Sequence, residues 1–187
     1  DRSWSLPLTV AAYRKPEFQV DVAPAVEQVV AGDQVQAEVS STYFFGGAVD
    51  GADVEWAVYA DTYSFQGPGR YSYDDPLDWY GYRWDTDYSF GYGDLVAEGS
   101  GTTDAAGRFT IELPADLGDK TGAQLWTIEA TVVDVNEQRV TGRTEVVVHP
   151  AAQYAGIYAD QYVGVAGDEQ KVNLIVVDLA GEAIPGA

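Results

Sequence analysis

The chain of 187 residues contains no cysteine and a single histidine, His149. Without cysteine it cannot form a disulfide, a thiolate metal site or a thiol nucleophile. His149 is followed by Pro150, and no motif nearby supplies the carboxylate and the nucleophile that a catalytic triad requires. We therefore expect His149 to be a structural surface residue, and the sequence predicts no catalytic residue, no metal site and no cofactor. We do not expect an enzyme.

Positive charge is also scarce, with 10 Lys and Arg residues against 30 Asp and Glu, a net charge of −20. Nucleic acid and anionic membranes are poor partners for such a chain, because binding them relies on basic side chains that neutralise phosphates. The acidity suits a soluble, self-repelling surface. Calcium or cationic-ligand sites, or a salt-adapted source, are the alternative explanations.

Long apolar runs are missing as well. No run approaches the roughly 18–20 residues that a membrane-spanning helix needs. The chain starts at Asp1 without a signal peptide. Any leader or anchor of the protein would have been removed or would lie outside this stretch.

No segment shows helical periodicity; apolar and polar residues alternate instead. This alternation places one row of side chains inward and one outward, which is typical of half-buried strands. Turn signals such as Thr103–Gly107 and Asp134–Gln138 separate the strands. The pattern predicts an all-β fold, an antiparallel seven-stranded β-sandwich of the immunoglobulin or fibronectin type. Its strands are expected near residues 17–23, 34–45, 53–60, 94–99, 107–113, 124–135 and 139–149.

A long-period repeat organises the chain. Val30–Ala52 aligns without a gap with Val165–Ala187, and 8 of the 23 positions are identical. The identities bracket an apolar strand with the same turn residues at both ends. A repeat at so long a period indicates one domain type in tandem.

The repeat predicts three parts. Residues 1–14 would be the last strand of a preceding domain, and Lys15-Pro16 the boundary, since proline ends a strand ladder and stiffens a linker. Residues 15–149 would be a complete sandwich with an aromatic insertion at about 60–94. Residues 150–187 would be the first strands of a following domain. Two strands alone are marginal in water, so we expect them to be poorly ordered or to borrow a partner from a neighbouring molecule.

The insertion combines many aromatic side chains with aspartates. We expect it to pack over the sandwich or against an adjacent domain, with two functional alternatives: a protein-binding face, or carbohydrate stacking by Trp79, Tyr80, Tyr82 or Trp84. Asp74–Asp78 and Asp85–Asp87 offer oxygen ligands for calcium, but they lack the glycine and the closing glutamate of a calcium loop, which favours solvated acidic loops. The possible interaction surface comprises Tyr71, Tyr73, Trp79, Tyr80, Tyr82, Trp84 and Tyr88.

Four segments together resemble the macroglobulin domains of bacterial α2-macroglobulin-like proteins: Tyr13–Val20, Tyr43–Val54, Thr103–Phe109 and Trp126–Asp134. The family typically ends its second strand at a Gly-x-Pro-Val-x-Gly-like turn, whereas this chain has Gly47–Gly51 without the proline. The resemblance covers nearly the whole chain. It implies the end of a second macroglobulin domain, a full third one and the start of a fourth.

The resemblance implies a role in large protease-trapping inhibitors, in which cleavage of a bait segment makes the scaffold rearrange and cage the protease. The thioester of many members needs a cysteine, so this stretch would be scaffold. Its partners would be neighbouring macroglobulin domains and, through the full-length protein, target proteases. The location would be the bacterial periplasm, cell surface or exterior, with the membrane reached only through an anchor elsewhere. The competing hypothesis is an adhesin-like or carbohydrate-binding module that uses the insertion.

Overall fold

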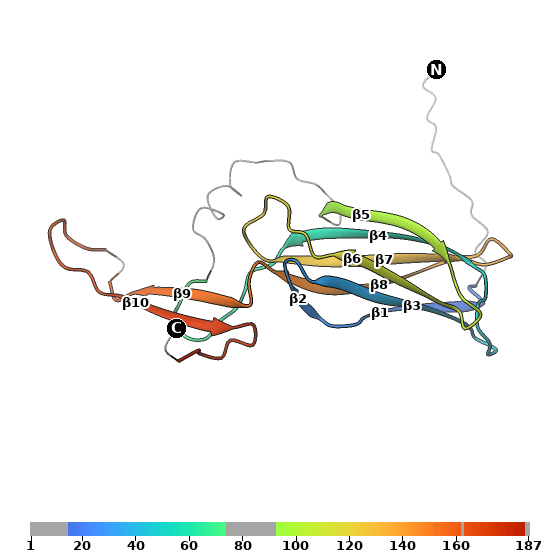
Figure 1. Ribbon diagram of the computed structural model, residues 1–187, viewed down its shortest axis with the longest axis horizontal. Helices are drawn as coiled ribbons and strands as arrows, with labels where there is room; N and C mark the ends of the chain where they lie inside the picture. The colour runs from blue at the N-terminus through green and yellow to red at the C-terminus, as the bar shows by residue number, and fades with distance from the viewer. Residues whose placement is uncertain (1–14, 74–92, 162, 186–187) are drawn as a thin grey trace, which may run out of the picture.

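The computed structural model describes residues 15–73, 93–161 and 163–185, and every regular element in these ranges is a β-strand (Figure 1). The strands are β1 (Phe18–Pro24), β2 (Gln28–Val30), β3 (Gln34–Tyr43), β4 (Asp53–Thr62), β5 (Asp94–Thr102), β6 (Arg108–Pro114), β7 (Gln124–Val133), β8 (Arg139–His149), β9 (Gln153–Ala159) and β10 (Val172–Asp178).

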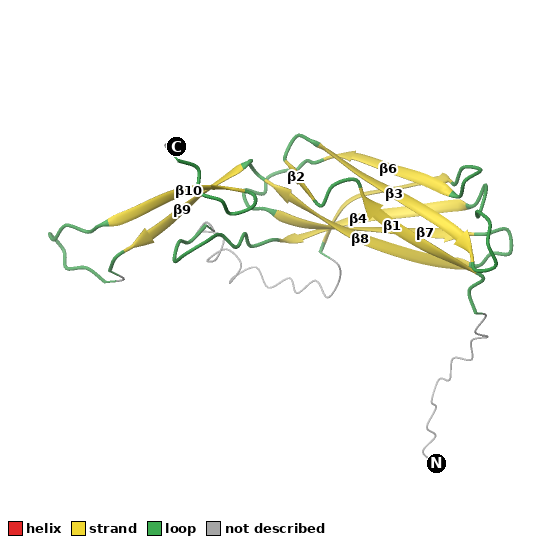
Figure 2. Cartoon of the chain, turned by 90° about the horizontal axis from the view of Figure 1, so that it is seen from below, coloured by secondary structure: helices red, strands yellow, loops and turns green. Residues whose placement is uncertain are grey.

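The first eight strands form two facing sheets, and the last two form a separate hairpin beside them (Figure 2). One sheet has the order β1-β3-β6 and the other β2-β8-β7-β4-β5. All pairs are antiparallel except β2 with β8, which run parallel. This arrangement confirms the predicted all-β sandwich.

The core lies between the two sheets and consists of the inward rows that the alternation predicts. On β7 the pattern is strict, because Trp126, Ile128, Ala130 and Val132 are all fully buried. The facing sheet contributes Val35, Ala37, Val39 and Ile111. Burying each larger aliphatic or aromatic side chain contributes about 1.5–3 kcal/mol, so these rows suffice for a stable core.

The seven predicted strands are confirmed to within two or three residues at most ends. The sequence pattern missed β2, because three residues are too few to show alternation. This strand carries the chain from the β1 sheet to the edge of β8, where Val30 pairs with His149. The predicted antiparallel sandwich therefore has one additional, parallel edge pair.

Several aspartates close the turns between strands. Asp104, Asp134 and Asp178 each accept hydrogen bonds from the backbone N–H groups two and four residues later, at 2.8–3.0 Å. The hydrogen bond from the backbone N–H of Arg108 is the main reason why the pKa of Asp104 is lowered. This contribution to stability is present at neutral pH and is lost as the pH falls and the carboxylate protonates. Some of the acidic residues of the chain therefore stabilise turns.

The sequence repeat is also a repeat in three dimensions. Phe18 faces Tyr43 in the β1–β3 pair, and the residues that correspond to them in the second copy, Gln153 and Asp178, face each other in the β9–β10 pair. The shift that carries Phe18 to Gln153 also carries the last residue of β1, Pro24, to the last residue of β9, Ala159. The hairpin therefore reproduces the register of β1 and β3.

The turns of the two copies match as well. The N–H of Tyr43 donates to Gly47 O at 3.0 Å, and the N–H of Asp178 donates to Glu182 O at the same distance. Backbone bridges follow at the corresponding pairs Thr42–Ala48 and Val177–Ala183. The positive φ angles at Gly46 and Gly181 explain why glycine is retained in both copies.

The fully buried Trp126 tests how far the sandwich depends on this core. Trp126→Ala leaves a large cavity between the sheets and should lower the free energy of unfolding by about 3–5 kcal/mol in urea titrations followed by circular dichroism. Val135→Ala is the control, since Val135 is 84% exposed; its effect should stay within about 0.5 kcal/mol. A loss below about 1 kcal/mol in Trp126→Ala would contradict the assigned core.

Candidate functional site

The described start of the insertion, residues 63–73, leaves the sandwich and runs to the hairpin; we call it the aromatic arm (Figure 1). The N–H of Tyr63 donates to Ala123 O, which continues the pairing of β4 with β7 for one residue. Gly69 then has a φ of 77° and lets the chain turn. The hydroxyl of Tyr73 donates to Pro68 O at 3.0 Å and closes the turn.

The tip of the arm pairs with β9. The N–H of Ser72 donates to Ile157 O at 2.8 Å, and the N–H of Ile157 donates to Ser72 O at 2.9 Å. This reciprocal exchange is the hydrogen-bonded pair of an antiparallel ladder. The arm of the same chain thus pairs with the hairpin through backbone hydrogen bonds.

Aromatic rings reinforce this contact. Phe65, which is buried, stacks on Tyr154 of β9 with ring centroids 4.0 Å apart and planes 3° from parallel. Further along, the ring of Tyr71 meets the ring of Tyr158 edge-on at 6.2 Å, and Arg70 donates to the Tyr158 hydroxyl at 3.3 Å. Two successive aromatic contacts therefore join the arm to one face of β9.

A glycine makes room for the arm on that face. Tyr154, Gly156 and Tyr158 alternate along β9, so they point to the same side. A Cβ atom on Gly156 would lie 2.6 Å from the ring of Tyr73 and 2.9 Å from the Cβ of Tyr71. The absence of a side chain at Gly156 thus lets Tyr71 and Tyr73 lie against the strand between the two tyrosines of β9.

His149 lies at the centre of this contact and is only 1% exposed. Its Nδ1 is 2.7 Å from the hydroxyl of Tyr154, and the rings of Tyr63 and Phe65 lie nearly perpendicular to it at 6.0 and 6.3 Å. Its Nε2 finds no hydrogen-bond partner among the described residues. The prediction of a surface histidine is therefore wrong, because the arm and β9 fold over a strand end that sequence reasoning leaves exposed.

Burial lowers the pKa of His149. Desolvating a charge costs several kcal/mol when no counter-charge compensates it. Attraction of an imidazolium to neighbouring aromatic rings returns only about 0.5–2 kcal/mol. The neutral ring is therefore the form that fits this site.

Of the predicted interaction surface, Tyr71 and Tyr73 are described, and both lie against the hairpin. Trp79, Tyr80, Tyr82, Trp84 and Tyr88 lie outside the described residues, as do the acidic stretches Asp74–Asp78 and Asp85–Asp87 considered for calcium. Sequence reasoning missed Phe65, Tyr154 and Tyr158 as parts of the site. The spacing of Tyr154, Gly156 and Tyr158 on one face of a strand is the signal that could have indicated them.

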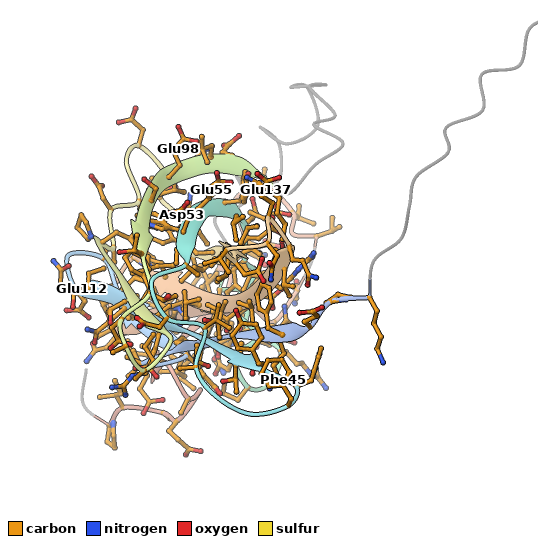
Figure 3. All side chains as sticks on the ribbon, turned by 90° about the vertical axis from the view of Figure 1, so that its right-hand side faces the viewer. Phe45, Asp53, Glu55, Glu98, Glu112 and Glu137 are labelled. Atoms are coloured by element: carbon orange, nitrogen blue, oxygen red, sulfur yellow. The ribbon has the colours of Figure 1, made fainter. Side chains whose placement is uncertain are left out.

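The outer face of the larger sheet carries a shallow acidic hollow. Glu55, Glu98 and Glu129 line it, and Figure 3 shows Glu55 and Glu98 on the neighbouring strands β4 and β5. Arg139 pairs with Glu55 at 3.1 Å, and Arg143 with Glu129 at 3.7 Å. Within the described ranges, no three His, Cys, Asp or Glu residues are grouped so that they could hold a metal ion. No helix there is long and apolar enough to cross a membrane.

Comparison with known proteins supports a fold assignment. No protein-family profile and no curated protein sequence matches the chain. Among solved structures, the native conformation of Escherichia coli α2-macroglobulin aligns with a TM-score of 0.62 and 13% identity over 92% of this chain and 11% of that protein. Salmonella α2-macroglobulin reacted with methylamine aligns with a TM-score of 0.62 and 12% identity over 92% of this chain and 12% of that one.

A third structure, E. coli α2-macroglobulin activated by porcine elastase, aligns with a TM-score of 0.61 and 14% identity over 90% of this chain and 15% of that one. The fold is therefore macroglobulin-like, as the resemblance in sequence implied. The chain spans 11–15% of the length of these three proteins.

A disulfide between arm and hairpin tests the observed contact. The chain has no cysteine, so Ser72→Cys with Ile157→Cys introduces the only two thiols. Cα atoms of a hydrogen-bonded antiparallel pair are about 5.5 Å apart, which lies within the range for a disulfide. We expect nearly complete oxidation in air, measured as loss of free thiol without dimer formation.

The matched control is Ser72→Cys with Val135→Cys, because Val135 is exposed in the turn between β7 and β8, away from the arm. This pair should form no intramolecular disulfide. Equal oxidation of both pairs would show that the arm does not rest on β9.

Proposed function

We propose that the chain is a scaffold section of a bacterial α2-macroglobulin-like, broad-range protease inhibitor, which traps proteases after they cleave a bait segment. The observation that carries the proposal is the likeness to bacterial α2-macroglobulin, with a TM-score of 0.62 over 92% of this chain. The match runs beyond the sandwich, which supports a role in a multi-domain array.

In this proposal, residues 1–14 end a preceding macroglobulin-like domain, residues 15–149 form a complete one, and residues 150–187 begin the next. The repeat of strand register and turns in the second copy supports the division. The aromatic arm and His149 then lie at an interdomain joint. Only residues 150–152 separate β8 from β9, so the connection itself is short.

The joint supports a mechanical role. Turning the following domain about the short connection would separate Phe65 from Tyr154 and break the Ser72–Ile157 pair. Such a joint holds two domains in one orientation until an applied force or a competing contact breaks it. A scaffold that rearranges after bait cleavage needs joints of this kind, because discrete packing arrangements convert a local cut into a large displacement.

The section carries no trap chemistry of its own in this proposal. It contains no cysteine for a thioester. Its partners are the neighbouring domains and, through the longer protein, target proteases. The protein acts in the bacterial periplasm, at the cell surface or outside the cell. The engagement of Tyr71 and Tyr73 with the hairpin supports a structural role for this part of the insertion over an adhesin-like or sugar-binding one.

The test uses the longer protein that contains this chain. After incubation with trypsin or elastase, we expect the bound protease to keep its activity on a small chromogenic peptide. Its remaining activity on a large protein substrate should be lower by a factor of at least about ten. The chain of 187 residues alone should change neither activity. If the longer protein leaves the activities on the small peptide and on the large protein equally high, the proposal is wrong.

A further inference from the structure

We propose that His149 is an acid-sensitive latch, whose protonation releases the aromatic arm and β9 from each other. The inference concerns the joint alone and does not depend on the activity of the longer protein. It starts from the position of the ring, which is 1% exposed and is covered by Phe65 from the arm and Tyr154 from β9.

The hydrogen bonding around the ring accommodates the neutral form only. A neutral imidazole has one N–H, and among the described residues a single hydrogen-bond contact, to the Tyr154 hydroxyl at 2.7 Å, is available to it. The imidazolium has two N–H groups. Its Nδ1–H can donate to Tyr154, but its Nε2–H meets no acceptor among the described residues. Protonation thus creates a buried donor and a buried charge together.

The described residues packed around the ring offer no counter-charge. Among the described residues, the titratable groups against it are Tyr63 of the arm and Tyr154 of β9, and neither is a carboxylate. On β2, Val30 pairs with His149, and the carboxylate of Asp33 accepts from the N–H of Val30 instead. On β7, the uncharged Gln124 pairs with Val148, the residue before His149.

The charged ring is most stable in water. Among the described residues, rings of the arm and of β9 cover it. His149 itself is fixed at the end of β8, because its carbonyl accepts from the N–H of Ala31 and its backbone pairs with β2. The elements able to move are therefore the arm and the hairpin. Opening them exposes the ring without disturbing the sandwich.

The pH range follows from linkage. Burial lowers the pKa of the ring in the docked state, whereas the exposed ring has an ordinary pKa of about 6.5. Above that value neither state takes up a proton, and docking is at its strongest. Below it the open state binds the proton first, so its population relative to the docked state rises by up to about tenfold for each pH unit.

The experiment uses the only histidine as its own reporter. In NMR spectra recorded from pH 8 to pH 5, the imidazole Cε1–H signal follows protonation, and the amide signals of Ser72 and Ile157 follow docking. We expect both amides to lose their docked positions with the same midpoint as the imidazole signal, while the amide of Ile128 in the core stays unchanged. If the amides keep their docked positions throughout this range, the latch does not exist.

The matched variant is His149→Phe with Tyr154→Phe, which keeps two aromatic rings and removes both polar partners. Its arm should remain docked down to pH 5. Release of the arm in this variant at the same pH as in the wild type would assign the effect to carboxylates and overturn the proposal. Should the variant fail to fold, as Ile128 reports, the wild-type midpoints decide: coincidence supports the latch, and separate midpoints overturn it.

Discussion

The connection between β8 and β9 is three residues long, and the remaining contacts of the joint depend on this constraint. A connection this short keeps β9 close to the end of β8, where His149 lies. Two further elements complete the enclosure: β2 runs along the end of β8, and the arm extends from β4 across the same end. A histidine at a strand end, ordinarily solvated, thereby becomes part of a small aromatic core between the sandwich and the hairpin.

The arm also adds stabilising contacts to the hairpin of β9 and β10. Two strands bury little apolar surface and are marginal in water, and Leu174 of β10 is 74% exposed. The arm adds one pair of backbone hydrogen bonds and a stacked aromatic pair to β9. Stacked or edge-on aromatic pairs contribute about 0.5–1.5 kcal/mol beyond their buried area. A contribution of this size is enough to bias the orientation of the hairpin relative to the sandwich.

The acidity of the chain has a partly structural explanation. Aspartates close the turns at Asp104, Asp134 and Asp178 by accepting two backbone N–H groups each. Others, such as Glu55 and Glu129, are paired with arginines across neighbouring strands. Exposed ion pairs of this kind contribute little to stability. The remaining carboxylates keep the surface strongly negative, which favours solubility and separation from other acidic surfaces.

The local alternation of apolar and polar residues determined most of the sandwich. The alternation in Trp126–Val132 and its counterparts defines both the strands and their inward faces, because the side chains of a strand alternate with a period of two. The recurrence of the Val30–Ala52 pattern likewise predicted a second copy, and the register of β9 and β10 reproduces that of β1 and β3. Tertiary structure alone decided three features: the parallel strand β2, the burial of His149, and the docking of the arm on β9. Each depends on a contact between residues far apart in sequence, such as Phe65 with Tyr154 or Val30 with His149. The spacing of Tyr154, Gly156 and Tyr158 marks one face of β9, but it does not say which segment lies against that face, since burial at such a contact is a property of the assembled elements.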